Sequence, residues 1–220
     1  ALYFYRKTNG TNTTAYATYT KTGGVSSSVL NGGNGNQDHA NTLVPDGTIA
    51  VGQGFVVKAS SNAITFNNAM RINDEHGIQL RTTLERHRIW LNMSNSAGFF
   101  SQTLVAYMAG ATNGVDAAID GRYFNDSQTA LTSIINTQEY AIQGRQLPFV
   151  ASDVVALGFK TELSNTYKIS LDKVDGMFLT SQVIYLRDKL TNIYTNLRTG
   201  SYTFSSVAGA FNDRFELRFA

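Results

Sequence analysis

Tyr167-Lys168-Ile169-Ser170-Leu171 opens the stretch that decides the fold, a series of short runs up to Phe219 in which apolar and polar residues alternate. Alternation of this kind has the period of a β-strand with one buried face. The later runs are Val183-Ile184-Tyr185-Leu186, Ile193-Tyr194-Thr195-Asn196-Leu197, Ser201-Tyr202-Thr203-Phe204 and Arg214-Phe215-Glu216-Leu217-Arg218-Phe219. The turn signals between them are Asp175-Gly176, Thr199-Gly200, Gly209 and Asn212-Asp213. The end of the chain therefore predicts an all-β fold.

Similar runs fill most of the chain before this stretch. Residues 2–7 and 14–20 suggest a hairpin around Asn9-Gly10. Residues 131–135 and 140–142 read either as two strands or as one short helix and a strand. Further strands are predicted at 48–50, 54–59, 64–66, 84–93, 99–108 and 154–159.

About a dozen short strands at this spacing are typical of a sandwich. We predict one antiparallel β-sandwich domain of jelly-roll type over residues 1–220, with long loops around 31–47 and 110–128. A separate smaller subdomain over residues 1–82 is the alternative. In the strand at 84–93, Ile89, Leu91 and Met93 form the apolar face and Trp90 lies on the other side.

The composition excludes several classes of protein. The net charge is +2 and only 15% of the residues are charged, without a basic cluster, so neither nucleic acid nor an anionic membrane is an expected partner. Cysteine is absent, which excludes disulfides, thiolate metal sites and a cysteine nucleophile. No apolar run approaches the ~20 residues of a membrane helix. The chain begins and ends on apparent strands without an initiator Met, so we expect a piece of a longer, processed protein.

Several segments in order resemble a family of proteins. They are GQGFVVKA (residues 52–59), FNNAMR (66–71), RIWLN (88–92), GATNGVD (110–116), LDKVDGMF (171–178), YLRDKL (185–190), YTF (202–204) and FNDRFELRF (211–219). This pattern is similar to exported Bacteroidetes proteins, especially flavobacterial ones, in the region that precedes the C-terminal sorting signal of the type IX secretion system. The resemblance implies a secreted or cell-surface protein, exported by that machinery through a signal that this sequence lacks.

One loop is a candidate metal site. Asp116, Asp120 and Asp126, with Asn113 or Asn125, could supply the oxygen ligands that calcium requires. Their spacing is not that of an EF-hand. The alternative is that these side chains cap turns through the backbone.

No catalytic or zinc motif is found in the sequence. His39, His76 and His87 lie far apart, and no GxSxG elbow, P-loop or dinucleotide fingerprint is present, so we do not expect an enzyme. Arg187 with Asp188, and Asp213 with Arg214, are interpreted as surface ion pairs at strand ends or as turn caps.

The aromatic residues allow a second kind of site. Tyr16, Tyr19, Trp90, Tyr107 and Tyr123 could form a platform on which sugar rings stack, although alternating aromatic residues more often fill a core, and Trp90 is expected to do so.

Three functional hypotheses therefore remain. The first is a non-catalytic extracellular structural, adhesion or self-assembly module, self-associating through terminal strands at Leu2–Tyr5 and Arg214–Phe219. The alternative is a carbohydrate-binding module attached to a secreted enzyme. A hydrolase is a third, weaker hypothesis.

Overall fold

The computed structural model describes residues 1–7, 14–26, 29–30, 44–58, 63–71, 85–125 and 127–220. Within these ranges the regular structure is almost entirely β-strand, and the helices are two short 3-10 turns, η2 (Asn68–Met70) and η3 (Gly176–Leu179). No helix in this part of the chain is long and apolar enough to cross a membrane. The predicted all-β class is confirmed.

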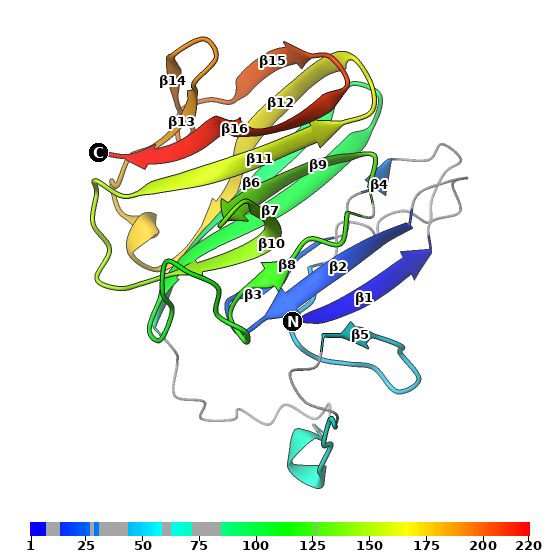
Figure 1. The fold of residues 1–220 in the computed structure, drawn as a ribbon. Helices are drawn as coiled ribbons and strands as arrows, with labels where there is room; N and C mark the ends of the chain where they lie inside the picture. The colour runs from blue at the N-terminus through cyan, green and yellow to red at the C-terminus, as the bar shows by residue number, and fades with distance from the viewer. Residues whose placement is uncertain (8–13, 27–28, 31–43, 59–62, 72–84, 126) are drawn as a thin grey trace.

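One long sheet contains most of the strands. In hydrogen-bonded order they are β14 (Ile193–Asn196), β13 (Ile184–Asp188), β16 (Gly209–Phe219), β11 (Val154–Thr161), β9 (Thr129–Ile135), β10 (Gln138–Arg145), β7 (Phe99–Met108), β6 (Arg86–Asn95), β12 (Asn165–Val174) and β15 (Tyr202–Ser206). Two short strands lie off this path, β4 (Val29–Leu30) beside β7 and β8 (Gly121–Arg122) beside β10. The sheet curls on itself (Figure 1), and the hydroxyl of Tyr202 in β15 donates to Asp188 in β13 at 2.8 Å. The result is a β-sandwich that approaches a closed barrel.

The inside of the curled sheet holds the main core. The predicted apolar face of β6, formed by Ile89, Leu91 and Met93, is fully buried there. Aromatic rings fill the centre, with centroids 4.8 to 6.3 Å apart among Phe159, Tyr167, Phe204 and Phe215. Each large apolar side chain buried here contributes about 1.5–3 kcal/mol, so this cluster is a main source of the stability of the fold.

A second sheet packs against the outside of the first. Its order is β3 (Gly23–Val25), β2 (Thr14–Thr20), β1 (Leu2–Lys7) and β5 (Val56–Val57). Val25 contacts the outer faces of β6, β7 and β10 in a small core with Trp90, Leu104 and Ile142. Trp90 is 4% exposed, and its Nε1 donates to the carbonyl of Gly24 at 3.0 Å. Both faces of β6 and β7 are therefore buried, and the expectation that Trp90 packs in a core is confirmed.

Most predicted strands are confirmed with small shifts of their ends. β1 and β2 pair antiparallel as expected, while the turn at Asn9-Gly10 and residues 31–43 of the long loop lie outside the described residues. The predicted strand 99–108 is β7, and 84–93 corresponds to β6. Residues 131–135 and 140–142 belong to the two strands β9 and β10, so the helical alternative is wrong.

Other expectations are wrong. β10 runs parallel to β7, with Ile142 opposite Leu104, so the sheet is not purely antiparallel. Residues 48–50 and 64–66 form no strand. Gly209 and Asn212-Asp213 do not form turns but lie inside β16, because β11 continues alongside and pairs Thr161 with Gly209. Jelly-roll connectivity and the single domain stay predictions.

The two terminal strands differ in their edges. Over residues 215–218, β16 is paired with β13 on one side and with β11 on the other, so this part of the strand has no open edge for an added strand. This part of the self-association hypothesis is wrong. The other terminal strand, β1, pairs with β2 on one edge. On its other edge, among the described residues, it pairs with β5 at Leu2 and Tyr3 only.

Candidate functional site

The most buried acidic side chain in the described ranges is Asp188, which is 0% exposed. Its carboxylate accepts hydrogen bonds from Arg214 Nη2 at 2.8 Å, from the Tyr202 hydroxyl at 2.8 Å and from the Leu190 N–H at 2.9 Å. Burial alone would raise the pKa of Asp188, but the hydrogen bonds from Arg214 and Tyr202 hold that pKa below its ordinary value. Because β13, β15 and β16 supply these groups, Asp188 ties the two ends of the long sheet together.

The predicted ion pairs between sequence neighbours are wrong, whereas the alternative of a turn cap is confirmed for Asp188, which accepts the N–H of Leu190. Adjacent residues of a strand point to opposite faces, so Arg187 and Asp188 cannot pair with each other. Arg187 Nη1 lies 3.0 Å from Glu216 Oε1 on the outer face, and Arg218 Nε donates to the same oxygen at 2.8 Å. Burial would raise the pKa of Glu216, but these two arginines lower it. Asp213 is exposed.

A second buried polar cluster joins β7 and β10 to the turn before β11. Arg145 donates to Asp153 through Nε at 2.7 Å and Nη2 at 2.6 Å, and the Tyr107 hydroxyl donates to the same carboxylate at 2.7 Å. Burial and the neighbouring Asp153 raise the pKa of the Tyr107 hydroxyl. Tyr107 is thus a fully buried core residue, and its assignment to a sugar platform is wrong.

Asp116 and Asp120 lie together in the turn before β8, whereas Asp126 lies outside the described residues. Asp116 accepts the backbone N–H of Thr112 at 2.6 Å. Asp120 accepts the backbone N–H groups of Asp116 at 2.6 Å and Gly144 at 2.7 Å. Burial raises the pKa of Asp120 to about 6, although these hydrogen bonds favour its charged form. The contacts within residues 112–120 are turn caps, whereas the bond from Gly144 joins this turn to β10. A calcium site that also uses Asp126 stays a prediction.

The other candidate metal ligands are dispersed. His39 and His76 lie outside the described ranges, and His87 Nδ1 accepts the backbone N–H of Met177 at 3.1 Å. The other ring nitrogen of His87, Nε2, lies 3.2 Å from Glu85 Oε1. Across the described portion of the chain, no three His, Cys, Asp or Glu side chains gather in a group that could hold a metal ion.

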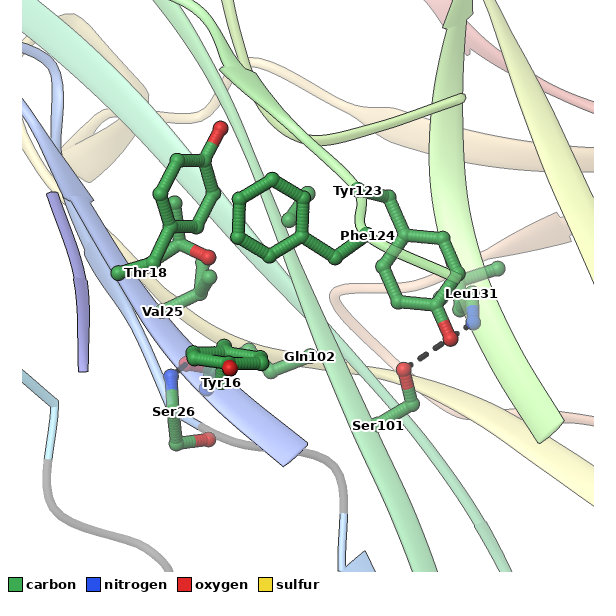
Figure 2. A pocket seen from close by; sticks show the side chains of 11 residues that line it. Tyr16, Thr18, Val25, Ser26, Ser101, Gln102, Tyr123, Phe124 and Leu131 are labelled. Carbon is green, nitrogen blue, oxygen red and sulfur yellow. Dashed lines mark hydrogen bonds between the residues drawn. The ribbon is translucent and has the colours of Figure 1, made fainter. Parts of the chain in front are cut away.

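The remaining candidates for the sugar platform, Tyr16, Tyr19 and Tyr123, lie in two different parts of the structure. Tyr19 packs against the backbone of Gly47. Tyr16 and Tyr123 line one pocket together with Tyr3 and Phe124, as Figure 2 shows for the labelled Tyr16, Tyr123 and Phe124. Of the five predicted platform residues, the structure therefore brings two together.

This pocket lies where the second sheet meets a fork in the long sheet. β10 pairs with β9 over Gln138–Tyr140 and with β7 over Ile142–Arg145, so β7 and β9 diverge around Ala141. The N–H of Leu131 closes the fork by donating to Ser101 Oγ at 3.1 Å (Figure 2). The cavity measures about 20 Å³. That volume admits one group of the size of a water molecule.

The polar floor of the pocket was missed by sequence reasoning. Ser26 is 3% exposed, its backbone N–H donates to Gln102 Oε1 at 3.2 Å, and its own hydroxyl has no hydrogen-bond partner among the described residues. Gln102 Nε2 donates to Asn92 Oδ1 at 2.9 Å and to Asp172 Oδ2 at 3.2 Å. Ser26 and Gln102 are 76 positions apart, so no local pattern in the sequence points to their contact.

A wider cleft of about 420 Å³ opens beside the start of β1. Lys21 and Lys58 are its charged side chains, and Leu2, Tyr19 and Ile64 contribute apolar surface. None of its described side chains has a buried polar atom that lacks a partner.

The fold and its closed polar clusters define an all-β sandwich domain with a small aromatic pocket between its two sheets. The chain belongs to the family described as a domain of unknown function, DUF8693, which matches residues 1–219. No curated protein and no solved structure matches the chain.

Proposed function

We propose that this chain is a non-catalytic structural or adhesive module of a larger secreted protein at the cell surface. The observation that carries the proposal is that the carboxylates of Asp153, Asp188 and Glu216 are each bound by arginine. The buried carboxylate of Asp120 is bound by the backbone N–H groups of Asp116 and Gly144. Among the residues that the structure describes, the lining of the aromatic pocket contains no Asp, Glu, His, Lys or Arg. General acid, base or nucleophilic catalysis needs such a group within reach of a substrate. The charged groups instead connect strands, as a rigid scaffold requires.

The sequence resemblance supports export. The segments shared with exported Bacteroidetes proteins favour passage through the type IX secretion machinery, directed by a C-terminal signal on the parent protein. In the native host, an antibody against this chain is expected to label intact cells or the medium. Deletion of that signal is expected to leave the protein inside the cell, and labelling that is unaffected by the deletion would contradict this route.

The absence of catalysis is tested on the purified chain. Panels of glycoside, ester and peptide substrates are expected to give no turnover. The proposal would be overturned if the chain turned over a substrate and a single substitution abolished that turnover without changing the thermal stability.

Self-association through β1 is kept as one form of the structural role. An exposed strand edge accepts a strand from a second copy through backbone hydrogen bonds, and within the described ranges β5 pairs with β1 at Leu2 and Tyr3 alone. Sedimentation velocity is expected to show concentration-dependent dimers that Tyr5→Pro abolishes. A chain that stays monomeric at all concentrations would exclude this form.

A further inference from the structure

The pocket between the two sheets has the features of a prepared site. Its floor is buried, because the fork between β7 and β9 is closed by the Ser101–Leu131 hydrogen bond and is covered by the second sheet. Its rim is formed by aromatic rings, and Phe124 there is 39% exposed. Apolar and aromatic walls with a few polar groups are common in small-molecule sites, and a cavity of about 20 Å³ can enclose only one small group of a ligand.

Ser26 supplies an unsatisfied polar group in this floor. A buried hydroxyl without a partner costs free energy, and the Ser26 hydroxyl has none within the described ranges of the chain. The neighbouring Gln102 amide already bonds to Ser26 N–H, Asn92 and Asp172. The Ser26 hydroxyl is therefore available for a hydrogen bond with an incoming group, and a serine hydroxyl both donates and accepts.

The aromatic rings continue from the pocket to the surface. The Tyr3 and Phe124 rings stack at 3.9 Å, the Tyr16 ring meets Phe124 edge-on at 5.3 Å, and Tyr5 lies 5.6 Å from Tyr16. We call Tyr3, Phe124, Tyr16 and Tyr5 the aromatic row. Its outer members, Phe124 and Tyr5, are 39% and 49% exposed, and the Tyr16 ring between them is inclined by 89° to Phe124 and by 59° to Tyr5. Phe124 is therefore the single exposed ring of this row that lines the pocket.

Size and charge narrow the class of ligand. A cavity of about 20 Å³ is too small for a ring but has room for one hydroxyl. The described part of the pocket lining carries no ionisable group apart from tyrosine, so a charged ligand would lose its hydration there without a counter-charge. A neutral molecule with a hydroxyl at the edge of a flat apolar ring satisfies both conditions, because the C–H face of a pyranose packs on an aromatic ring.

We propose that this pocket and the aromatic row bind a neutral saccharide, with one sugar hydroxyl on Ser26 and its pyranose ring on Phe124. This site does not depend on the scaffold role proposed above.

The test is calorimetric titration of the chain with cellohexaose, xylohexaose, mannohexaose and laminarihexaose, and with hexagalacturonate as the charged comparison. At least one neutral hexasaccharide is expected to bind saturably, and hexagalacturonate is not. Phe124→Ala and Ser26→Ala are each expected to weaken binding about tenfold. The matched control is Tyr194→Ala, since Tyr194 is 50% exposed in β14 and lies outside the pocket lining and the aromatic row; its affinity is expected to be unchanged.

Thermal unfolding of each variant separates binding from folding. If Phe124→Ala unfolds, Phe124→Leu replaces it, because leucine retains apolar packing against Tyr3 but removes the ring. Binding that persists in the folded Phe124 variant, equal binding of hexagalacturonate, or loss of binding in Tyr194→Ala would overturn the proposal. The absence of binding by all four neutral hexasaccharides would also overturn it and leave the cavity as a site for structural water.

Discussion

Replacement of Asp188 by asparagine tests how the long sheet is closed. The carboxylate lies in β13 and bonds to Arg214 of β16 and Tyr202 of β15. Asp188→Asn keeps the shape of the side chain but removes its charge. Arg214, which is 9% exposed and lies over the rings of Phe204 and Phe215, would then be left without its buried counter-charge.

The expected cost is large because one partner of a buried ion pair is removed. Such changes cost about 3–5 kcal/mol, mostly because an uncompensated charge remains buried. For a domain of this size, about 2–4 °C of melting temperature accompanies each kcal/mol. The melting temperature of Asp188→Asn is therefore expected to fall by about 6–20 °C.

Urea unfolding followed by circular dichroism gives the free energy of unfolding. Asp213→Asn is the control, because Asp213 is exposed and precedes Arg214 in the chain; it is expected to cost under about 0.5 kcal/mol. The double replacement Asp188→Leu with Arg214→Met should recover most of the loss, since an apolar pair needs no counter-charge. If Asp188→Asn were no more destabilising than Asp213→Asn, the role of Asp188 in closing the sheet would be refuted.

Three further predictions follow from buried groups. The pKa of Asp120 is about 6 in the folded protein and 3.8 ordinarily, so the folded state binds more protons between pH 3.8 and pH 6. The free energy of unfolding is therefore expected to fall by about 1 kcal/mol from pH 5 to pH 7. Urea titrations of Asp120→Asn are expected not to show this fall. Gly144→Ala would place a Cβ 2.1 Å from Ile119 Cγ2, so calorimetry is expected to show about 1–3 kcal/mol of destabilisation, and an unchanged melting temperature would contradict this packing. Ser26→Ala removes a buried hydroxyl that has no partner among the described residues. The free energy of unfolding is expected to stay unchanged or to rise by up to about 1 kcal/mol. A clear decrease of this free energy in urea unfolding would mean that the hydroxyl has a partner.

The strands were predictable because their signal is local. Alternation along β6 placed Ile89, Leu91 and Met93 on one face and Trp90 on the other. The same alternation excludes a pair between Arg187 and Asp188, which point to opposite faces of β13. That error could have been avoided from the sequence alone.

Other features depend on partners that are distant in the chain. The turn signals at Gly209 and Asn212-Asp213 do not end the strand, because β16 pairs with β11 at Gly209 and on both sides of Asn212-Asp213. Asn212-Asp213 lie where the register of this ladder shifts, between the pair of Phe159 with Phe211 and the pair of Leu157 with Phe215. The parallel pairing of β10 with β7 has no local signature, because it brings together strands that are not joined by a hairpin.

The sequence by itself determined the all-β class and the buried face of each strong strand, because side-chain periodicity reports which face avoids water. Only the tertiary structure decided that Asp188 pairs with Arg214 and that Ser26 meets Gln102 beneath Tyr16 and Phe124. These contacts arise where a curled sheet brings its ends together and where a second sheet covers its outer face. The order in which strands pair, rather than the residues of any one strand, places them in contact.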